Sequence, residues 1–548
     1  MATPETADLV FVGGNVITMA AEQPRASALA VADGRIVAVG DDADVLALAG
    51  PGTERVDLAG RTLLPGFVEA HGHPTLEMVI TGPDIVDIRP VVCPTAEDAL
   101  GKLRAAVAAA EPGEWVGAFG WDPLLQEGLP TIGRELLDDI APDRPLSVMH
   151  NSGHSAWGNS LVVEQVGLTR DTPDPVGSHF ERDADGNPTG AAFESPATVL
   201  IMSGALRRPD GAGFDELMAR EHRMLAAVGV TTTSDMAFSR ETREPLQDFY
   251  RTGDARVRMR VYERSTPEKR TDIEPGQDAA DPMLQQIGIK IWADGSPWVG
   301  NIATSFPYLD TPQTRAMGLG AGHRGCANYS REQLVEIVDA YFPLGWQIAC
   351  HVHGDEVVDM VLDVFEDALR AHPERTDARL RLEHCGTMTP EQYRRAAELG
   401  VTCSLFVDHL YYWGDVLVDG LFGERGEAWT AAGAAVDAGV KISFHNDPPV
   451  TPEEPLRNIQ VAVTRKSRSG RVLGEQYRVS VDQALRAQTI DAAWQLFAED
   501  VIGSLEVGKR ADLVVLDADP HAVAPETIGD IAVRATYLDG RRTFQAGE

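Results

Sequence analysis

The sequence predicts an α/β protein built on a (β/α)8 barrel of the TIM type. Strand-like and helix-like segments alternate through the middle of the chain, which is typical of a parallel sheet with crossover helices. Side chains that can bind a metal stand near the ends of several of these strands. Barrels of this type keep their chemistry at the carboxyl ends of the strands, so we expect a metal centre at that mouth.

Eight segments have the apolar character and length of strands, which is the number that closes a barrel. Helix-start signals lie between them, in the form of capping boxes that pair Ser330 with Gln333, Thr389 with Gln392, and Ser480 with Gln483. The predicted barrel occupies residues 63–499. Its strands are expected at residues 63–71, 230–236, 256–262, 287–294, 346–353, 380–384, 401–407 and 441–447.

The first and second predicted strands are separated by far more chain than a crossover connection requires. We therefore expect residues 76–215 to form an inserted subdomain beside the carboxyl end of the first strand. Because that end is the catalytic face of a barrel, the insertion is placed to cover the active site as a lid and to select the substrate.

The two chain ends resemble each other and differ from the middle. Asp33-Gly34 and Asp539-Gly540 each join two short apolar strands, as two-residue hairpin turns do. Short strands at both ends that lack a full core of their own predict one small β-sandwich, formed by residues 1–62 and 500–548.

Composition limits the class of partner. The chain has 548 residues, and its 83 acidic and 48 basic side chains give a formal net charge of −35, which argues against nucleic acid or an anionic membrane. The first ten residues lack the pattern of a signal peptide, and no segment has the run of apolar residues that crosses a bilayer. The five cysteines do not form a disulfide framework, so we expect a cytoplasmic protein.

His71 and His73 stand two residues apart at the end of the first strand, so both side chains project to the same side. Two neutral imidazoles at one place suit zinc or a similar divalent ion. Taken alone, the pair could equally be two histidines of the core, and the downstream ligands favour the metal.

Lys290 lies within an apolar strand that faces the barrel interior, where an ammonium group is costly. A neutral amine can react with carbon dioxide to give a carbamate, an anion whose two oxygens can bridge two cations. A lysine that extends its charged end to the surface is the alternative. The other ligands favour the carbamate.

His351, His384 and Asp447 each close a later strand and complete the predicted ligand set. His353 shares a face with His351, and either can bind the metal; we favour His351. A divalent cation lowers the pKa of water, and Asp447 is expected to take the proton as general base and return it to a leaving nitrogen. His445 either supports a ligand or is structural. Cys350 and Cys385 neighbour two ligands but should face the helices as buried thiols.

The HGHP, IGIKIWADGS, HVHGD, RLEHCG and SFHNDPPV segments, with the ending IGSLEVGKRADLVVLD, resemble the amidohydrolase superfamily. The likeness is greatest to the branch that includes the N-substituted formamide deformylases. It implies a TIM-like metallohydrolase barrel and hydrolysis of a carbon–nitrogen bond other than a peptide bond. By position, it gives ligand roles to His71, His73, Lys290, His351, His384 and Asp447.

The expected substrate is a small molecule. His154 in the insertion lies in a segment common in this branch and can polarise a substrate carbonyl, while Trp121 and Trp298 lie in loops that can line an apolar pocket. Two alternatives stay open: a deaminase with one zinc ion, and a barrel that keeps metal for structure. The number of ions, the exact substrate and self-association into a homo-oligomer are also open.

Overall fold

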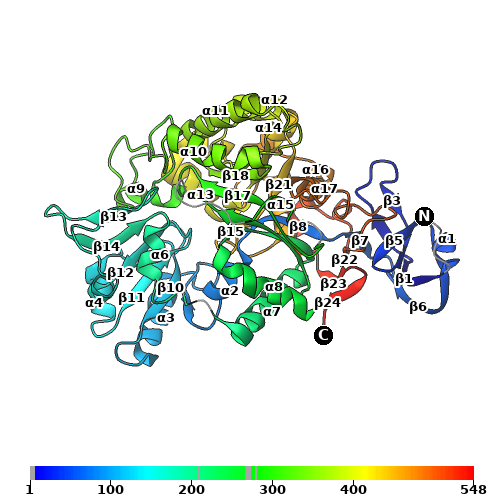
Figure 1. Cartoon of the computed structure of the whole chain (residues 1–548), viewed down its shortest axis with the longest axis horizontal. Coiled ribbons are helices and arrows are strands. Elements are labelled where there is room, and N and C mark those ends of the chain that lie inside the picture. The colour runs from blue at the N-terminus through cyan, green and yellow to red at the C-terminus, as the bar shows by residue number, and fades with distance from the viewer. Residues whose placement is uncertain (1–5, 208, 266–272, 278–280, 548) are drawn as a thin grey trace.

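Eight parallel strands form a nearly closed barrel at the centre of the molecule (Figure 1). The computed structural model describes residues 6–207, 209–265, 273–277 and 281–547. The first five residues, part of the segment without a signal-peptide pattern, lie outside this range. The order of strands in the sheet follows their order in the chain, and β21 also lies beside β8, which brings the two edges together.

All eight predicted barrel strands are present. They are β8 (Phe67–Gly72), β15 (Val230–Phe238), β16 (Arg258–Arg264), β17 (Leu284–Trp292), β18 (Gln347–Val352), β19 (Arg381–His384), β20 (Thr402–Leu405) and β21 (Ile442–Phe444).

Helices cover the outside of the barrel, and each of the three predicted capping boxes starts one. Ser330, Thr389 and Ser480 accept hydrogen bonds from the backbone at Gln333, Gln392 and Gln483, and each glutamine side chain binds back to the cap residue. The helices that they begin are α10 (Arg331–Tyr341), α12 (Pro390–Glu398) and α16 (Val481–Ala487). Others on the barrel are α7 (Gly211–Ala227), α8 (Arg243–Thr252), α11 (Asp355–Ala371), α14 (Ala432–Asp437), α15 (Pro455–Thr464) and α17 (Ile490–Gln495).

The first predicted strand, residues 63–71, is two strands in two sheets. β7 (Thr62–Pro65) pairs with β22 (Leu513–Leu516) near the C-terminus, whereas β8 belongs to the barrel. Gly66 separates them, and a Cβ atom there would lie 2.2 Å from the side chain of Thr231. A larger residue would push the two sheets apart at this junction.

The segment between β8 and β15 contains a sheet of its own, which lies to one side of the barrel in Figure 1. Its helices are α3 (Ala96–Ala109), α4 (Arg134–Ile140), α5 (Ser160–Gln165) and α6 (Ala197–Met202), and two hydrophobic clusters pack against it. The six strands, in sheet order, are β13 (His179–Arg182), β14 (Pro188–Phe193), β12 (Ser155–Gly158), β11 (Leu146–His150), β10 (Val116–Trp121) and β9 (Ile85–Asp87).

Strands from the two chain ends meet at the opposite side of the barrel (Figure 1). Both predicted hairpins are present: Asp33 and Asp539 have φ angles of 50° and 51°, each followed by a glycine with positive φ. The four-stranded sheet, in order, is β5 (Arg35–Gly40), β4 (Ala28–Ala32), β1 (Ala7–Val12) and β6 (Ala49–Asp57). The six-stranded sheet is β24 (Arg541–Gln545), β23 (Val533–Leu538), β22, β7, β2 (Asn15–Ile17) and β3 (Arg25–Ala26). One hydrophobic cluster takes residues from both sheets. The domain limits and the β-sandwich as a separate unit stay predictions.

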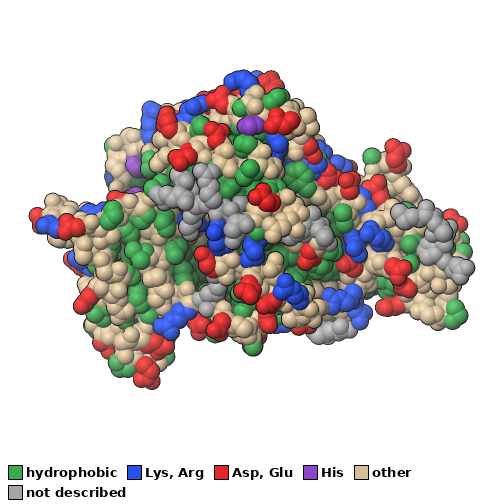
Figure 2. Space-filling view, viewed as in Figure 1, with side chains coloured by type: hydrophobic (Ala, Val, Ile, Leu, Met, Phe, Trp, Pro, Cys, Tyr) green, Lys and Arg blue, Asp and Glu red, His purple; other side chains and the backbone are tan. Residues whose placement is uncertain are grey.

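Acidic side chains are spread over the visible face with basic ones among them, which fits a solvated acidic surface (Figure 2). Within the described residues, none of the helices combines the length and apolar character needed to cross a bilayer.

Candidate metal centre

Histidine and aspartate side chains from separate barrel strands gather at the carboxyl mouth. Three overlapping groups have ligand atoms within 4.8 Å of one another, and they are His71–His73–Asp447, His351–His353–His384 and His71–His384–His445. All of the histidine and aspartate ligands predicted from the sequence belong to these groups. Whether they bind a metal stays a prediction.

Asp447 Oδ1 lies between two imidazoles, 2.9 Å from His73 Nε2 and 3.2 Å from His71 Nε2. Neither contact has the geometry of a hydrogen bond, and this buried oxygen has no hydrogen-bond partner among the described residues. Lone pairs of two nitrogens and one carboxylate oxygen that face a common point are what a divalent cation requires. The residues therefore fit a cation at this place.

The second group lies at the ends of β18 and β19. The ring centroids of His351 and His384 are 4.3 Å apart, and those of His353 and His384 are 4.9 Å apart. His351 Nε2 is 2.9 Å from the Gly295 carbonyl oxygen, to which it donates as the N–H, so Nδ1 is the nitrogen left for a ligand. His353 Nδ1 is buried and has no hydrogen-bond partner among the described residues. The choice between His351 and His353 thus stays open.

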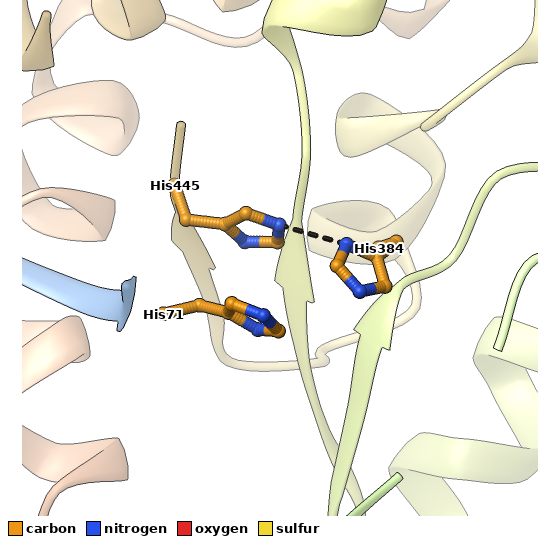
Figure 3. Close-up of side chains that lie close together, drawn as sticks. All are labelled: His71, His384 and His445. Carbon is orange, nitrogen blue, oxygen red and sulfur yellow. Dashed lines mark hydrogen bonds between the residues drawn. The ribbon is translucent and has the colours of Figure 1, made fainter. Parts of the chain in front are cut away.

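His445 stacks on His71, with centroids 4.5 Å apart, and its Nε2 lies 3.1 Å from His384 Nδ1 (Figure 3). Figure 3 shows the two rings side by side and both directed toward His384. Ser404 Oγ is 2.9 Å from His445 Nδ1 and fixes the ring. His445 thus contacts two predicted ligands, and whether it supports them or is structural stays a prediction.

Backbone strain accompanies this cluster. His384, Cys385 and Asp447 have φ angles of 68°, 55° and 52°, in the left-handed region that non-glycine residues rarely adopt. Such residues gather at functional sites, where the surrounding structure keeps them in place. Cys350 and Cys385 are buried free thiols outside the three groups, and both belong to a hydrophobic cluster.

Glu383 corrects one expectation from the sequence. Strand alternation placed its side chain away from that of His384, but the Glu383 carboxylate lies inside the barrel, 2.6 Å from His71 Nδ1. The left-handed turn at His384 ends the alternation, so neighbouring side chains both reach the interior. Arg381 donates to Glu383 at 3.0 Å. Burial would raise the pKa of Glu383, but Arg381 and His71 lower it to about 2.

Lys290 is fully buried on β17, and its Nζ atom is 3.3 Å from His71 Nε2. The structure thus brings the predicted lysine to the histidines. Burial lowers the pKa of Lys290 to about 8, which makes the neutral amine accessible.

Burial favours the neutral form of His71, His351 and His384, which is the form that metal ligation requires. Desolvation lowers the pKa of His71, and it holds the pKa values of His351 and His384 well below the ordinary range. Burial would raise the pKa of Asp447, but His71 and His73 hold it far below its usual value, so the carboxylate is ionised.

A cavity of about 1090 Å³ opens onto the cluster. Ligand-group residues His71, His73, His351, His384 and Asp447 lie on its wall. The insertion supplies another part of the wall. Apolar residues lining the cavity include Leu76, Val79, Ile80, Phe119, Met149, Val199, Leu206 and Phe238.

Of the three substrate-binding residues predicted from the sequence, one lines the cavity and two do not. His154 lines the cavity, 5.0 Å from His351 between ring centroids, and its Nδ1 is 2.6 Å from Glu194 Oε2. Trp121 and Trp298 are not on the cavity wall. Trp121 is buried in a core of the insertion, and Trp298 stacks on Trp413 at 4.7 Å. Neither residue lies in the loop expected from the sequence: Trp121 ends β10, and Trp298 lies in the 3-10 turn Pro297–Val299. Both rings are buried because large aromatic surfaces gain most from burial.

A model of the amidohydrolase family matches residues 54–544. The chain belongs to the amidohydrolase family. The resemblance indicated by the sequence motifs is confirmed, and the family's residues cover the barrel, the insertion and the strands near the C-terminus. The described structure of this amidohydrolase agrees with a TIM-like barrel.

Curated relatives of this amidohydrolase match along nearly the whole chain. An N-substituted formamide deformylase of Arthrobacter pascens is 29% identical, with 97% of both chains covered. The protein LONG AFTER FAR-RED 3 of Arabidopsis thaliana is 28% identical over 98% of this chain and 92% of its own. YtcJ of Bacillus subtilis is 25% identical, with 98% and 99% covered.

Solved structures show the same fold. A metal-dependent hydrolase from Pyrococcus horikoshii has a TM-score of 0.71 at 23% identity, over 94% of this chain and 99% of that one. A second, from Pyrococcus furiosus, has a TM-score of 0.67 at 25% identity, over 93% and 99%.

Proposed function

We propose that this amidohydrolase cleaves a carbon–nitrogen bond other than a peptide bond, in an amide, an N-substituted formamide or a cyclic amide. The observation that carries the proposal is the position of Asp447 Oδ1 between His71 and His73, on the wall of a cavity large enough for a small molecule. The family and the formamide deformylase relative support the class of reaction.

The proposed ligands divide into two sets. His71, His73 and Asp447 bind one divalent ion, and His384 with His351 binds a second, with His353 as the alternative to His351. Nitrogen and carboxylate donors favour zinc. Lys290, as the carbamate that its neutral amine forms with carbon dioxide, would contribute ligand oxygens to both sets. Its place beside His71 supports this role, because an ammonium there would oppose a cation.

A bound divalent ion supplies an acidified water and polarises the carbonyl group of the substrate. Asp447 accepts the proton of the attacking water and donates it to the nitrogen as the carbon–nitrogen bond breaks. Its ionised carboxylate, with a pKa far below neutral, is in the state that the first of these steps requires. His154, fixed by Glu194, is the proposed donor to the substrate carbonyl oxygen.

Hydrolysis of an amide bond fits the geometry of the site better than deamination does. A deaminase needs a carboxyl group that gives a proton to the substrate, and Glu383 is the residue beside a strand-end histidine. Its carboxylate binds Arg381 and His71 and is not on the cavity wall. A barrel that keeps metal only for structure would not need ligand atoms on the wall of a substrate cavity.

Turnover tests the proposal. The zinc-loaded protein is assayed against aryl and alkyl formamides, hydantoins and N-acyl amines, with chelator-treated protein as the control. We expect release of amine or acid from at least one class and loss of activity on chelation. Ammonia released from an aminated ring, with none of these amides cleaved, would favour the deaminase.

A further inference from the structure

Arg264 stands at the carboxyl end of β16 and lines the cavity, where the nearby charge of Glu194 favours its charged form. Its side chain is partly buried, and its guanidinium has no ion pair or hydrogen bond to any of the described residues. The contact that it does make is with the Trp292 ring, whose centroid is 5.4 Å from Cζ. A partly buried cation with five unused N–H donors is costly unless an anion joins it.

The other charges of the cavity are already engaged. Arg240 lies 3.2 Å from Glu263, and Glu194 is bound by His154 at 2.6 Å. Carboxylates elsewhere on the wall are also engaged, Asp174 by Arg182, Asp447 by His71 and His73, and Glu241 by contacts of its own. Within the described residues, Arg264 is therefore the cavity cation that makes no direct ion pair, since the nearby Glu194 is bound by His154 and Asn301.

Trp292 connects Arg264 to the proposed metal centre. Arg264 and Lys290 are Cα partners in the ladder between β16 and β17. Lys290 Nζ lies 5.0 Å from the same Trp292 centroid, and it lies 3.3 Å from His71 Nε2. Arg264 Cζ at 5.4 Å and Lys290 Nζ at 5.0 Å from one centroid are thus at most 10.4 Å apart. A substrate that spans the two points is short.

We propose that Arg264 binds a carboxylate carried by the substrate, on the substituent of the nitrogen whose bond is cleaved. A guanidinium matches a carboxylate through two parallel hydrogen bonds, which gives both affinity and orientation. The apolar wall formed by Ile80, Phe119 and Met149 then receives the rest of that substituent. The substrate class is an N-formyl or N-acyl amino acid with an apolar side chain. This inference rests on the proposed function.

The test compares two formamides that differ only in the carboxylate, N-formylphenylalanine (both enantiomers) and N-formylphenethylamine. With zinc-loaded wild type, kcat/KM for one enantiomer should exceed that for the uncharged compound by about 10- to 100-fold, as expected for hydrogen bonds to a charged group. Arg264→Gln should remove this preference, and Arg264→Lys should restore part of it. Arg251→Gln, at an exposed site on α8, is the matched control.

Calorimetry separates this inference from the proposed function. Binding of both formamides is measured to zinc-loaded Asp447→Asn and to the same protein with Arg264→Gln. Tighter binding of the carboxylate compound that is lost with Arg264→Gln supports the inference even if neither compound is hydrolysed. Equal binding of the two compounds, or an equal loss for both with Arg264→Gln, would overturn it.

Discussion

The Nδ1 atom of His71 lies 2.6 Å from Glu383 Oε2, and both side chains are buried. His71 lies on β8 and Glu383 lies on β19, so the contact between them crosses the barrel interior. Arg381 Nη2 donates to the same carboxylate oxygen at 3.0 Å, and Arg381 Nε lies 2.8 Å from the other oxygen, Oε1. This chain of three charged or polar groups fixes the ring so that Nε2 faces Asp447 and Lys290.

Glu383→Gln should therefore weaken metal binding without removing a ligand. Loss of a carboxylate that orients a metal-binding histidine lowers metal affinity or activity about 10- to 100-fold. Zinc affinity is measured by competition with a chelator, and Glu391→Gln on the exposed face of α12 is the control. Unchanged affinity in Glu383→Gln would show that the contact does not position His71.

Asp447→Asn tests the proton-transfer role. The amide cannot accept a proton, so kcat should fall about 10²- to 10⁴-fold while the fold and most of the metal remain. Initial rates measure kcat, circular dichroism checks the fold, and elemental analysis measures the metal content. Asp363→Asn, at an exposed site, is the control variant. A turnover number equal to that of wild type would exclude Asp447 as the general base.

Much of the fold follows from local sequence. The capping boxes at Ser330, Thr389 and Ser480 are all present, because the Ser or Thr and Gln side chains of a box satisfy each other within one turn. The split of residues 63–71 into β7 and β8 was not predicted. It depends on the close approach of Thr231 to Gly66, which is a contact between distant parts of the chain.

The candidate site was only partly predictable. The ligand residues follow from strand ends, but the inward position of Glu383 depends on the left-handed backbone at His384, for which a pattern of residue types gives no signal. Trp121 and Trp298 were expected in a pocket and lie in cores, because loop and core aromatics look alike in sequence. Arg264 was missed although a signal exists: it is the second of two charged residues that follow the predicted strand 256–262, at the end where barrels place substrate contacts.

The chemical state of Lys290 tests whether the chain binds one metal ion or two. If its carbamate bridges the sets, the intact wild-type protein should be heavier by one molecule of carbon dioxide under gentle ionisation. Lys290→Met should then bind about one ion fewer per chain. Lys441→Met, whose side chain is about half-exposed, is the control. Full metal content in Lys290→Met and no added mass in wild type would remove the lysine from the ligand set.

Asp122 gives a prediction about stability. Burial raises its pKa from 3.8 to about 7, and its Oδ2 atom accepts a hydrogen bond from Trp413 Nε1 at 3.1 Å. A carboxyl group with a raised pKa binds more protons in the folded state, so its contribution is complete below the unfolded pKa and is lost as the pH rises through about 7. Asp122→Asn should remove this dependence.

Urea unfolding of wild type and Asp122→Asn from about pH 5 to about pH 8 measures the effect. The free energy of unfolding of wild type should fall relative to the variant as the pH rises, by a total of a few kcal/mol. The substitution also alters the contact with Trp413, which changes the free energy of unfolding by the same amount at every pH. This constant difference does not affect how the free energy of unfolding varies with pH. Parallel curves across the range would contradict a raised pKa at Asp122.

The most direct test of the whole account is anomalous scattering from crystals of the zinc-loaded protein, collected on both sides of the zinc absorption edge. We predict a peak in contact with His71, His73 and Asp447, and a second beside His384 and His351 or His353 if Lys290 is a carbamate. Full zinc loading with no anomalous peak among these side chains would contradict the metal centre and the hydrolysis built on it.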